Sequence, residues 1–332
     1  MANKLNLEKK NINFVSYVIT IFNKRKYIND VFNSLLKEGG SHKREYILID
    51  DGSTDSSAAV INSLFKKLPG RVIFIKRKNM GASFSTNQAV NLANAFWIRL
   101  LDGDDCVTYK STEKMLNLAL KYKTEFVYGK MKRNEKKFYN DKNKDHIFQT
   151  RKSGLKKFIR NCPANSSCIF LSKRRYYYSG GCNESFVSPD PLLFLRLFAS
   201  GSGVFLKSIV TLLPFEDASK ERLSNQIKRS RYESIFALIK FCEENSFIDT
   251  KIRKMAYKRS ISRAFNYYKY FTNSFFSLFL WYYIYSKFFF PQDYTRIMYR
   301  CLSVFNEKEK NKPYNWLTGS DKYALSKSRI RN

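Results

Sequence analysis

Residues 95–105 join a strongly apolar segment to a dense group of carboxylates. The segment 95–101 (AFWIRLL) predicts a buried strand. Asp102, Asp104 and Asp105 follow it directly, with Gly103 among them. Carboxylates at this spacing repel one another, and a divalent cation that also carries a phosphate group would relieve the repulsion. An acidic turn without any ligand is the alternative, because Asp and Gly are common turn residues.

Strand-like and helix-like segments alternate along the first 130 residues. Strands are expected at 14–21, 46–49, 72–75, 95–101 and 126–128, and helices at 27–36, 58–65, 85–94 and 111–122. This alternation predicts an α/β fold with a mostly parallel sheet and helices on both faces. Asp50 and Asp51 follow the second strand as Asp102 follows the fourth. In such a sheet both acidic groups would lie at the same edge.

The second half of the chain divides into two parts of different character. Residues 130–144 are charged and are expected to form an excursion from the sheet. After it, 155–159 and 192–198 predict helices, 168–171 is a short apolar run, and 204–206 with 209–210 predicts a late strand. From about residue 219 strand signals are scarce and Phe, Tyr, Lys and Arg dominate. We therefore expect an α/β domain over residues 1–218 and a basic, aromatic helical region over 219–332.

The formal net charge of +32 on 332 residues implies an anionic partner, which is a nucleic acid, a nucleotide or an acidic membrane surface. Six cysteines without a C-x-x-C pair, together with only two histidines, argue against a structural zinc site or a disulfide framework and fit the cytosol. Residues 1–13 lack the apolar segment of a signal peptide, and residues 271–290 are too polar for a good spanning helix.

Four stretches resemble motifs of the family 2 glycosyltransferases, which have the GT-A fold. The stretch 15–23 (VSYVITIFN) is similar to the family's opening strand and turn, and 49–55 (IDDGSTD) matches the family pattern residue for residue. Residues 79–89 (NMGASFSTNQA) lead to 101–105 (LDGDD), and a weaker match covers 188–197. The resemblance implies a nucleotide-sugar half at 14–110 and an acceptor half at 111–218.

The resemblance also implies roles for the donor-side residues. Thr20, Phe22 and Asp51 would line the nucleoside pocket, and Asp102 would contact the ribose or the sugar. Asp104 would hold Mn²⁺ or Mg²⁺ on the diphosphate of a nucleotide-sugar, most simply a UDP-sugar. The chain would then be a metal-dependent glycosyltransferase of the hexosyltransferase type.

The resemblance makes Asp190 the catalytic base that deprotonates an acceptor hydroxyl, so that transfer inverts the anomeric centre. The acceptor would be a glycan or a lipid-linked sugar in bacterial surface polysaccharide or lipooligosaccharide synthesis. Three positions depart from the family pattern, namely Phe22 for Tyr, Thr86 for Arg and Pro189 for a carboxylate. These departures concern the donor contacts and Asp190 more than the fold.

Several of these residues also have structural interpretations. Asp190 followed by Pro191 is a common helix start, in which the carboxylate caps the helix. Asp50 is expected to fix a turn, Asn87 to brace a loop, and Arg196 to pair with an acidic residue instead of phosphate. His42 and His146 lie in polar stretches and are expected at the surface.

The basic helical region is expected to lie on an anionic membrane surface, which would make a cytoplasmic enzyme peripheral on the inner face of the cell membrane. Aromatic residues of 275–290 and cations of 253–263 would make that contact. Two alternatives differ in class. A nucleic-acid-binding protein would use the basic aromatic surface but leaves the carboxylates unexplained. A catalytically silent GT-A scaffold would account for the three departures.

Overall fold

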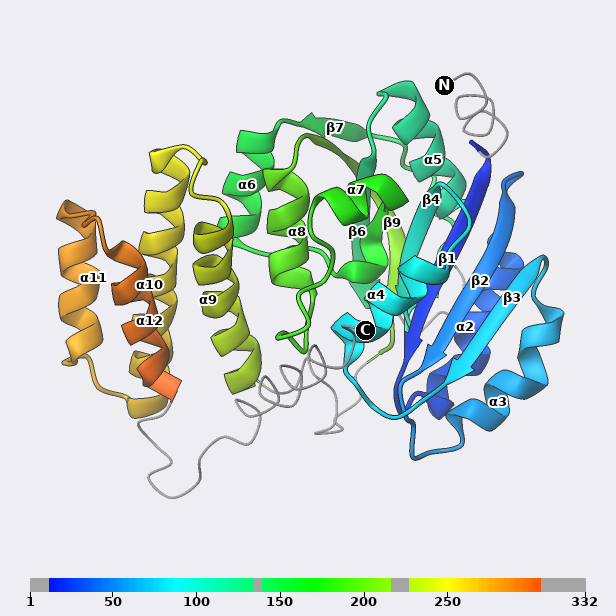
Figure 1. Cartoon of the computed structure of the whole chain (residues 1–332), viewed down its shortest axis with the longest axis horizontal. Coiled ribbons are helices and arrows are strands. Elements are labelled where there is room, and N and C mark those ends of the chain that lie inside the picture. Colours follow the sequence, from blue (N-terminus) through cyan, green and yellow to red (C-terminus); the bar gives the residue numbers. More distant parts are fainter. Residues whose placement is uncertain (1–11, 134–138, 216–226, 306–332) are drawn as a thin grey trace, which may run out of the picture.

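The computed structural model describes residues 12–133, 139–215 and 227–305 (Figure 1). Among these residues, nine strands form one sheet, and strand β1 (Phe14–Ile21) lies inside it. The other strands are β2 (Lys43–Asp50), β3 (Arg71–Lys76), β4 (Trp97–Asp102), β5 (Cys106–Val107), β6 (Phe126–Arg133), β7 (His146–Gln149), β8 (Ile169–Ser172) and β9 (Gly203–Leu213). The helices of the α/β part are α2 (Arg25–Lys37), α3 (Ser57–Leu64), α4 (Ala82–Leu92), α5 (Ser111–Lys121), α6 (Arg151–Arg160), α7 (Lys173–Tyr178) and α8 (Asp190–Ala199).

The first four long strands form the parallel arrangement that the sequence predicts. β1 pairs with β2 on one side and β4 on the other, and β3 extends the sheet beyond β2. In this register Thr20 stands opposite Ile49 and opposite Asp102. The carboxyl ends of β1, β2 and β4 therefore meet at one edge, and each of the two acidic groups begins there.

The rest of the sheet is mixed, so the expectation of a mostly parallel sheet holds only for its first half. β8 runs antiparallel to β4 and β6, while β9 runs parallel to β6 and antiparallel to β5 and β7. An antiparallel neighbour needs no crossover helix, and β5, β7 and β8 are too short to give a clear strand pattern. Residues 130–133, predicted as the start of an excursion, instead continue β6.

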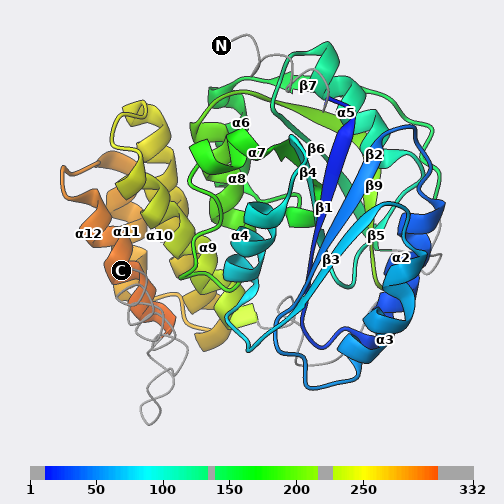
Figure 2. The same cartoon turned by 45° about the vertical axis from the view of Figure 1, so that its right-hand side comes forward.

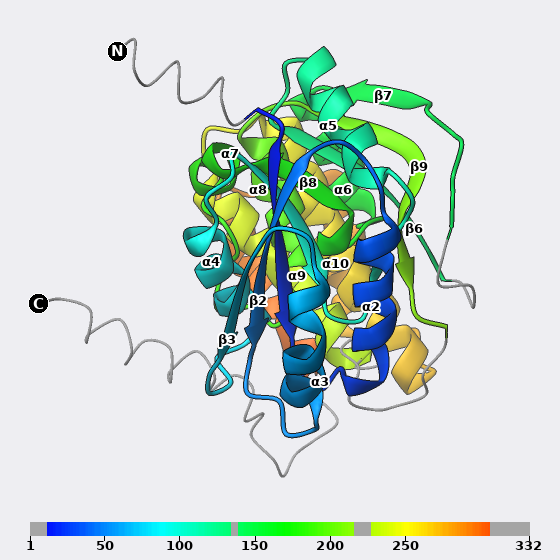
Figure 3. The same ribbon diagram turned by 90° about the vertical axis from the view of Figure 1, so that its right-hand side faces the viewer.

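Helices cover both faces of the sheet, with α4 on one side and α2 and α3 on the other (Figure 3). Between the sheet and helices α6 and α8 lies an aromatic cluster in which the rings of Phe158 and Phe194 stack with centroids 4.3 Å apart. Tyr128 packs edge-on against Phe194, and Phe126 against Phe198. This cluster joins the sheet to the part of the chain that carries Asp190.

Four helices follow the α/β part: α9 (Ile227–Glu244), α10 (Thr250–Thr272), α11 (Leu278–Phe288) and α12 (Tyr294–Cys301). They stand beside α6 and α8, away from β1, β2 and β3 (Figures 1 and 2). The predicted boundary near residue 218 and the segments 1–11 and 306–332 lie outside the described residues, so the domain limits stay predictions. No helix within the described ranges is long and apolar enough to cross a membrane.

The two histidines differ from the surface position that the sequence suggests. His42 is buried, and its Nε2 lies 2.8 Å from the hydroxyl of Tyr17, which also donates to Glu38. His146 is half-buried and lies 2.6 Å from the hydroxyl of Tyr122. The prediction of surface positions rested on the polar residues next to each histidine in the sequence. It was wrong because both rings are held by tyrosines that are distant along the chain. The six cysteines are free thiols, as expected, and five of them are buried.

Gly154 tests the packing of α6 against α8. A Cβ atom at this position would lie 2.0 Å from Cδ1 of Phe198, inside the aromatic cluster. Ala normally stabilises a helix relative to Gly, but here we expect Gly154→Ala to lower the free energy of unfolding by about 1–3 kcal/mol through overpacking. Urea denaturation measures this change. Lys156→Ala, on the exposed side of the same helix, should change stability by less than about 0.5 kcal/mol. Equal or higher stability of Gly154→Ala would contradict the packing described.

Candidate active site

Two acidic loops are attached to the end of β1 by backbone hydrogen bonds. The N–H of Asp51 donates to the carbonyl of Ile21 at 2.8 Å, and the N–H of Gly103 donates to that of Thr20 at 2.9 Å. A Cβ atom on Gly103 would lie 2.7 Å from Cγ1 of Ile21. Only glycine therefore allows the loop after β4 to approach β1 so closely. The predicted convergence of the two acidic groups on one sheet edge is present.

The loop after β2 is shaped by Asp50 and Asn23. Asp50 is fully buried, and its Oδ1 accepts a hydrogen bond from the N–H of Ser53 at 3.1 Å. Oδ1 of Asn23 accepts from the N–H of Thr54 at 2.8 Å. These bonds fix the turn and tie it to the loop after β1, while Oδ2 of Asp50 is buried without a hydrogen-bond partner in the described structure. The structural interpretation of Asp50 as a turn-fixing residue is confirmed.

Asp51 is buried and holds a third loop. Its Oδ1 lies 2.8 Å from Nη2 of Arg77 and accepts from the N–H of Met80 at 2.9 Å, while Oδ2 accepts from the N–H of Gly81 at 2.7 Å. A carboxylate offers about four acceptor positions, so Oδ2 retains one for a further donor. Sequence reasoning missed Arg77, although it stands directly before the Asn79-Met80-Gly81 motif.

The carboxylates after β4 crowd together in a largely buried position. Burial, followed by the charges of Asp104 and Asp102, raises the pKa of Asp105 well above its usual value. Burial, followed by the charges of Asp190 and Asp104, raises the pKa of Asp102 to about 7. Nζ of Lys24 lies 2.8 Å from Oδ2 of Asp104. The group therefore carries more negative charge than its surroundings easily stabilise, and it has a lysine as its cation partner.

Ser166 links Asp190 to this group. Its N–H donates to Oδ1 of Asp190 at 2.8 Å, and its hydroxyl donates to Oδ1 of Asp102 at 3.2 Å. Asp190 is the first residue of α8, but its side chain does not cap that helix, because Pro189 occupies the cap position. The capping interpretation of Asp190 is therefore wrong. Burial raises the pKa of Asp190 to about 6 against the stabilising hydrogen bonds from Ser166.

The helical region reaches the loop before Asp190 through Glu233 of α9. The two carboxylate oxygens of Glu233 accept from the N–H groups of Val187 and Ser188 at 2.9 and 3.0 Å. Arg196 of α8 lies 2.5 Å from Glu244 of α9, which confirms its predicted ion pair with an acidic residue. Sequence reasoning missed Glu233, because no local pattern connects a residue of α9 to a loop 46 residues earlier.

The remaining predicted residues lie in different settings. Thr20 is half-buried at the end of β1, and the Phe22 ring beside it is 44% exposed. Asn87 does brace a loop, because its Oδ1 accepts from the Tyr176 hydroxyl at 2.6 Å and its Nδ2 donates to the Cys182 carbonyl at 3.0 Å. Asn87 is thereby committed to the chain itself.

The carboxylates after β4 suit a divalent cation that shares its oxygen ligands with a bound phosphate. Within residues 12–133, 139–215 and 227–305 no three His, Cys, Asp or Glu side chains are arranged to hold a metal ion alone. Asp104, with Asp102 and Asp105 nearby, supplies hard oxygen donors of the kind that Mg²⁺ and Mn²⁺ accept. Their raised pKa values show that a neighbouring positive charge would stabilise the ionised forms.

Comparison with known sequences places these motifs in one family. Residues 16–180, about half of the chain, match the model for glycosyl transferase family 2. An uncharacterized glycosyltransferase of Haemophilus influenzae is 31% identical over 36% of this chain and 47% of its own length. The minor teichoic acid biosynthesis protein GgaB of Bacillus subtilis is 27% identical over 36% of this chain and 13% of its own length. The chain thus spans less than half the length of these relatives.

Comparison with solved structures extends over nearly the whole fold. S. aureus TarS, residues 1–349, superimposes with a TM-score of 0.61 and 15% identity over 95% of this chain and 92% of that one. The same fragment in complex with UDP-GlcNAc gives a TM-score of 0.60 at 14% identity, again over 95% and 92% of the two chains. The fold is therefore that of a GT-A glycosyltransferase, including the C-terminal helices.

The Asp51–Arg77 pair gives a test of the site's internal support. Asp51→Ala leaves the largely buried guanidinium of Arg77 without its carboxylate, so we expect the free energy of unfolding to fall by about 3 kcal/mol. Arg77→Ala should cost a similar amount. The double variant should cost clearly less than the sum, with a coupling energy of about 1–3 kcal/mol. Additive losses in a urea-denaturation cycle would contradict the ion pair.

Proposed function

Because the chain belongs to the family 2 glycosyltransferases, we propose that it transfers a sugar from a UDP-sugar to a hydroxyl group of a glycan or lipid-linked acceptor. One observation carries the proposal: the carboxylates after β2 and β4 meet at one sheet edge, and Ser166 joins Asp102 of this edge to Asp190. An open α/β sheet binds ligands at this edge. The complexes of the TarS fragment with UDP and UDP-GlcNAc support a uridine donor.

The nucleoside would bind between the ends of β1 and β2. The free acceptor position on Oδ2 of Asp51 suits the N–H of a uracil ring, while Arg77 and the loop at Met80 hold the carboxylate in place. Thr20 lies at the floor of this region. The exposed ring of Phe22 can pack against the base or the ribose, a contact that needs no hydroxyl group. The replacement of the family's Tyr is therefore compatible with donor binding.

The diphosphate would lie beside the carboxylates after β4, with Asp102 toward the ribose or the sugar. Asp104 would hold the Mn²⁺ or Mg²⁺ ion there, and the ion would supply positive charge to the leaving nucleoside diphosphate. The ammonium of Lys24 forms an ion pair with the Asp104 carboxylate. When the donor binds, Lys24 would have to leave Asp104 and contact the phosphate oxygens instead. Lys24 would then be a second cation at the diphosphate, beside the metal ion. It would replace the positive charge of the arginine that the family often has at the position of Thr86.

Asp190 would act as the base. It accepts the proton of the acceptor hydroxyl while the acceptor oxygen forms a bond to the anomeric carbon, and the bond from that carbon to the diphosphate breaks. This single displacement inverts the anomeric centre. The raised pKa of Asp190 brings the carboxylate closer to the working pH and makes it a better proton acceptor than an exposed aspartate. Glu233 fixes the loop that orients Asp190.

The acceptor would belong to a bacterial cell-surface polysaccharide. Matched relatives include the poly(ribitol-phosphate) beta-glucosyltransferase of Bacillus spizizenii at 28% identity and the chondroitin synthase of Escherichia coli at 34% identity. We propose that the enzyme works at the cytoplasmic face of the membrane, where a lipid-linked acceptor would be within its reach.

Substitution of Asp104 tests this assignment. We expect Asp104→Asn to lower the rate of UDP release from UDP-hexoses and UDP-N-acetylhexosamines by about 100-fold or more in the presence of Mn²⁺, because one charge beside the diphosphate is lost. The control is Asp145→Asn, which changes an exposed carboxylate far from the sheet edge and should release UDP as the wild type does. An Asp104→Asn enzyme with the wild-type rate would remove the proposal.

The pH dependence tests Asp190. A base must be deprotonated to act, and burial raises its pKa to about 6. We therefore expect kcat/KM for UDP release at saturating Mn²⁺ to be flat above pH about 7 and to fall about tenfold per pH unit well below pH 6. Asp190→Asn should lower the rate by about 100-fold or more while donor binding stays intact. Activity that persists in Asp190→Asn would assign the base to another residue.

A further inference from the structure

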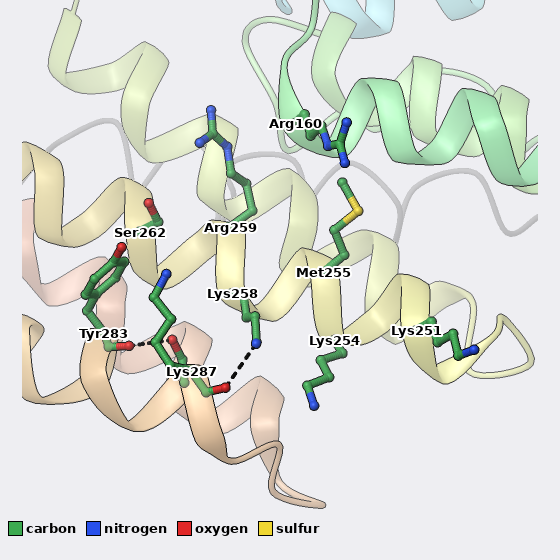
Figure 4. A pocket seen from close by; sticks show the side chains of 10 residues that line it. Arg160, Lys251, Lys254, Met255, Lys258, Arg259, Ser262, Tyr283 and Lys287 are labelled. Carbon is green, nitrogen blue, oxygen red and sulfur yellow. Dashed lines mark hydrogen bonds between the residues drawn. The ribbon is translucent and has the colours of Figure 1, made fainter.

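A basic pocket opens on the helical region, away from the candidate active site. It has a volume of about 440 Å³ and lies between α6, α10 and α11 (Figure 4). In Figure 4 the Lys258 side chain extends from α10 toward α11, where its ammonium donates to the Lys287 carbonyl at 3.2 Å. Six cations line the pocket: Arg160, Lys251, Lys254, Lys258, Arg259 and Lys287.

The positive charge of this pocket has little acidic charge near it in the part of the chain that the structure describes: Lys251 interacts with Asp249, which also pairs with Lys152. The other residues that line it are Met255, Ser262, Tyr283 and Ser286, and none of them is acidic. No side chain of the six cations forms an ion pair with a described Asp or Glu. Burial, together with the charge of Arg231, lowers the pKa of Arg259. A bound anion would relieve this repulsion.

Helix α11 also turns an apolar face to solvent. Leu278, Trp281, Tyr285 and Phe288 recur every three or four residues and so lie on one face. Trp281 is 66% exposed and Phe288 is 74% exposed. Phe279 and Ser286, on the opposite side, are buried, and the Phe279 ring packs against Tyr268 of α10. Large exposed apolar side chains grouped on one helix face mark an interaction surface.

We propose that α10 and α11 dock the chain on an anionic phospholipid membrane. The basic pocket receives the phosphate of a lipid headgroup, and the apolar face of α11 enters the interfacial layer of the bilayer. A membrane of this kind offers both chemistries at once, since its headgroups are anionic and its interior is apolar. A single-stranded nucleic acid would satisfy the cations and could stack bases on the exposed rings, but it offers no apolar layer to the exposed aliphatic side chain of Leu278. A partner with only an apolar surface would cover Trp281 and Phe288 but would leave the cations of the pocket without an anion.

The two features lie on neighbouring sides of α11. Successive helix residues are about 100° apart, so Lys287 lines the pocket on the flank of the helix, Phe288 lies on the apolar face, and the exposed Ile284 lies between them. Trp and Tyr have apolar rings with one polar group, which suits the headgroup level of a bilayer. Attachment needs no spanning segment, in agreement with the lack of one among the described helices. The inference does not depend on the proposed transfer reaction, because it concerns only where the chain binds.

Vesicle co-sedimentation of the full chain tests the inference. The wild type should sediment with vesicles of phosphatidylcholine and phosphatidylglycerol and remain in solution with phosphatidylcholine alone. Lys254→Glu/Lys258→Glu should weaken binding to the anionic vesicles by about tenfold or more. Trp281→Ser/Phe288→Ser should weaken it by a similar factor, because the buried apolar area is lost.

Two matched variants control for nonspecific effects. Lys66→Glu/Lys67→Glu makes the same charge change on the exposed side chains that follow α3, at the far end of the molecule (Figure 1). Tyr178→Ser removes an aromatic ring that is 77% exposed elsewhere. Both should bind anionic vesicles within about twofold of the wild type, apart from the general effect of net charge at low salt.

Several results would overturn the inference. Equal wild-type binding to neutral and anionic vesicles, or no binding to either, would do so. So would a Lys254→Glu/Lys258→Glu variant that binds as its charge control does. Light scattering that shows a wild-type dimer and a monomeric Trp281→Ser/Phe288→Ser variant would assign the apolar face to a second copy. Binding of a single-stranded oligonucleotide that only the pocket variant loses, without vesicle binding, would assign the pocket to nucleic acid.

Discussion

The parallel pairing of β1 with both β2 and β4 is the constraint on which the rest of the site depends. It sets Thr20 beside Ile49 and Asp102, so that the loops that carry Asp51 and Asp104 start from the same edge. Backbone hydrogen bonds from both loops return to β1, and Gly103 allows the close approach that one of them needs. A shift of one residue in either pairing would turn the side chains of the shifted strand to the other face of the sheet and move the loop that follows it.

This pairing places carboxylates together at an electrostatic cost, and the surrounding contacts reduce it. Lys24 neutralises Asp104, Arg77 neutralises Asp51, and Ser166 donates hydrogen bonds to Asp102 and Asp190. The pKa of Asp102 nevertheless stays raised. The positive charge of a metal ion bound together with the donor's diphosphate would reduce this remaining repulsion between the carboxylates. The helical region takes part, because Glu233 binds the backbone before Asp190. Docking of α10 and α11 on a membrane would therefore hold the site in a fixed orientation to that surface.

Local patterns in the sequence predicted what depends on neighbouring residues. The parallel half of the sheet and the turn at Asp50 are of this kind, because motif and periodicity specify them. The roles expected of Asn87 and Arg196 are also confirmed, but their partners Tyr176, Cys182 and Glu244 lie 48 to 95 residues away and could not be named from the sequence. The antiparallel strands β5, β7 and β8 are too short for a periodic signal. Arg77, Lys24 and Glu233 contact loop residues 26 to 80 positions away along the chain, so tertiary packing alone brings them to the site. His42 was predicted at the surface for the same reason, because its hydrogen-bond partner Tyr17 lies on β1 and is not a neighbour in the sequence. Asp190 is not the helix cap that the sequence predicted, because the helix starts one position earlier and Pro189 occupies the cap position.

The central claim is that the carboxylates at the end of β1, β2 and β4 bind a nucleoside diphosphate together with a divalent ion. A thermal-shift titration with UDP, GDP and CDP, each with and without Mn²⁺, tests it most directly, because a ligand that binds only the folded state raises the midpoint by mass action. The account predicts a rise with UDP that requires Mn²⁺ and disappears in Asp104→Asn. No shift with any nucleotide, or an equal shift in Asp104→Asn, would contradict it and leave the acidic loops with a purely structural role.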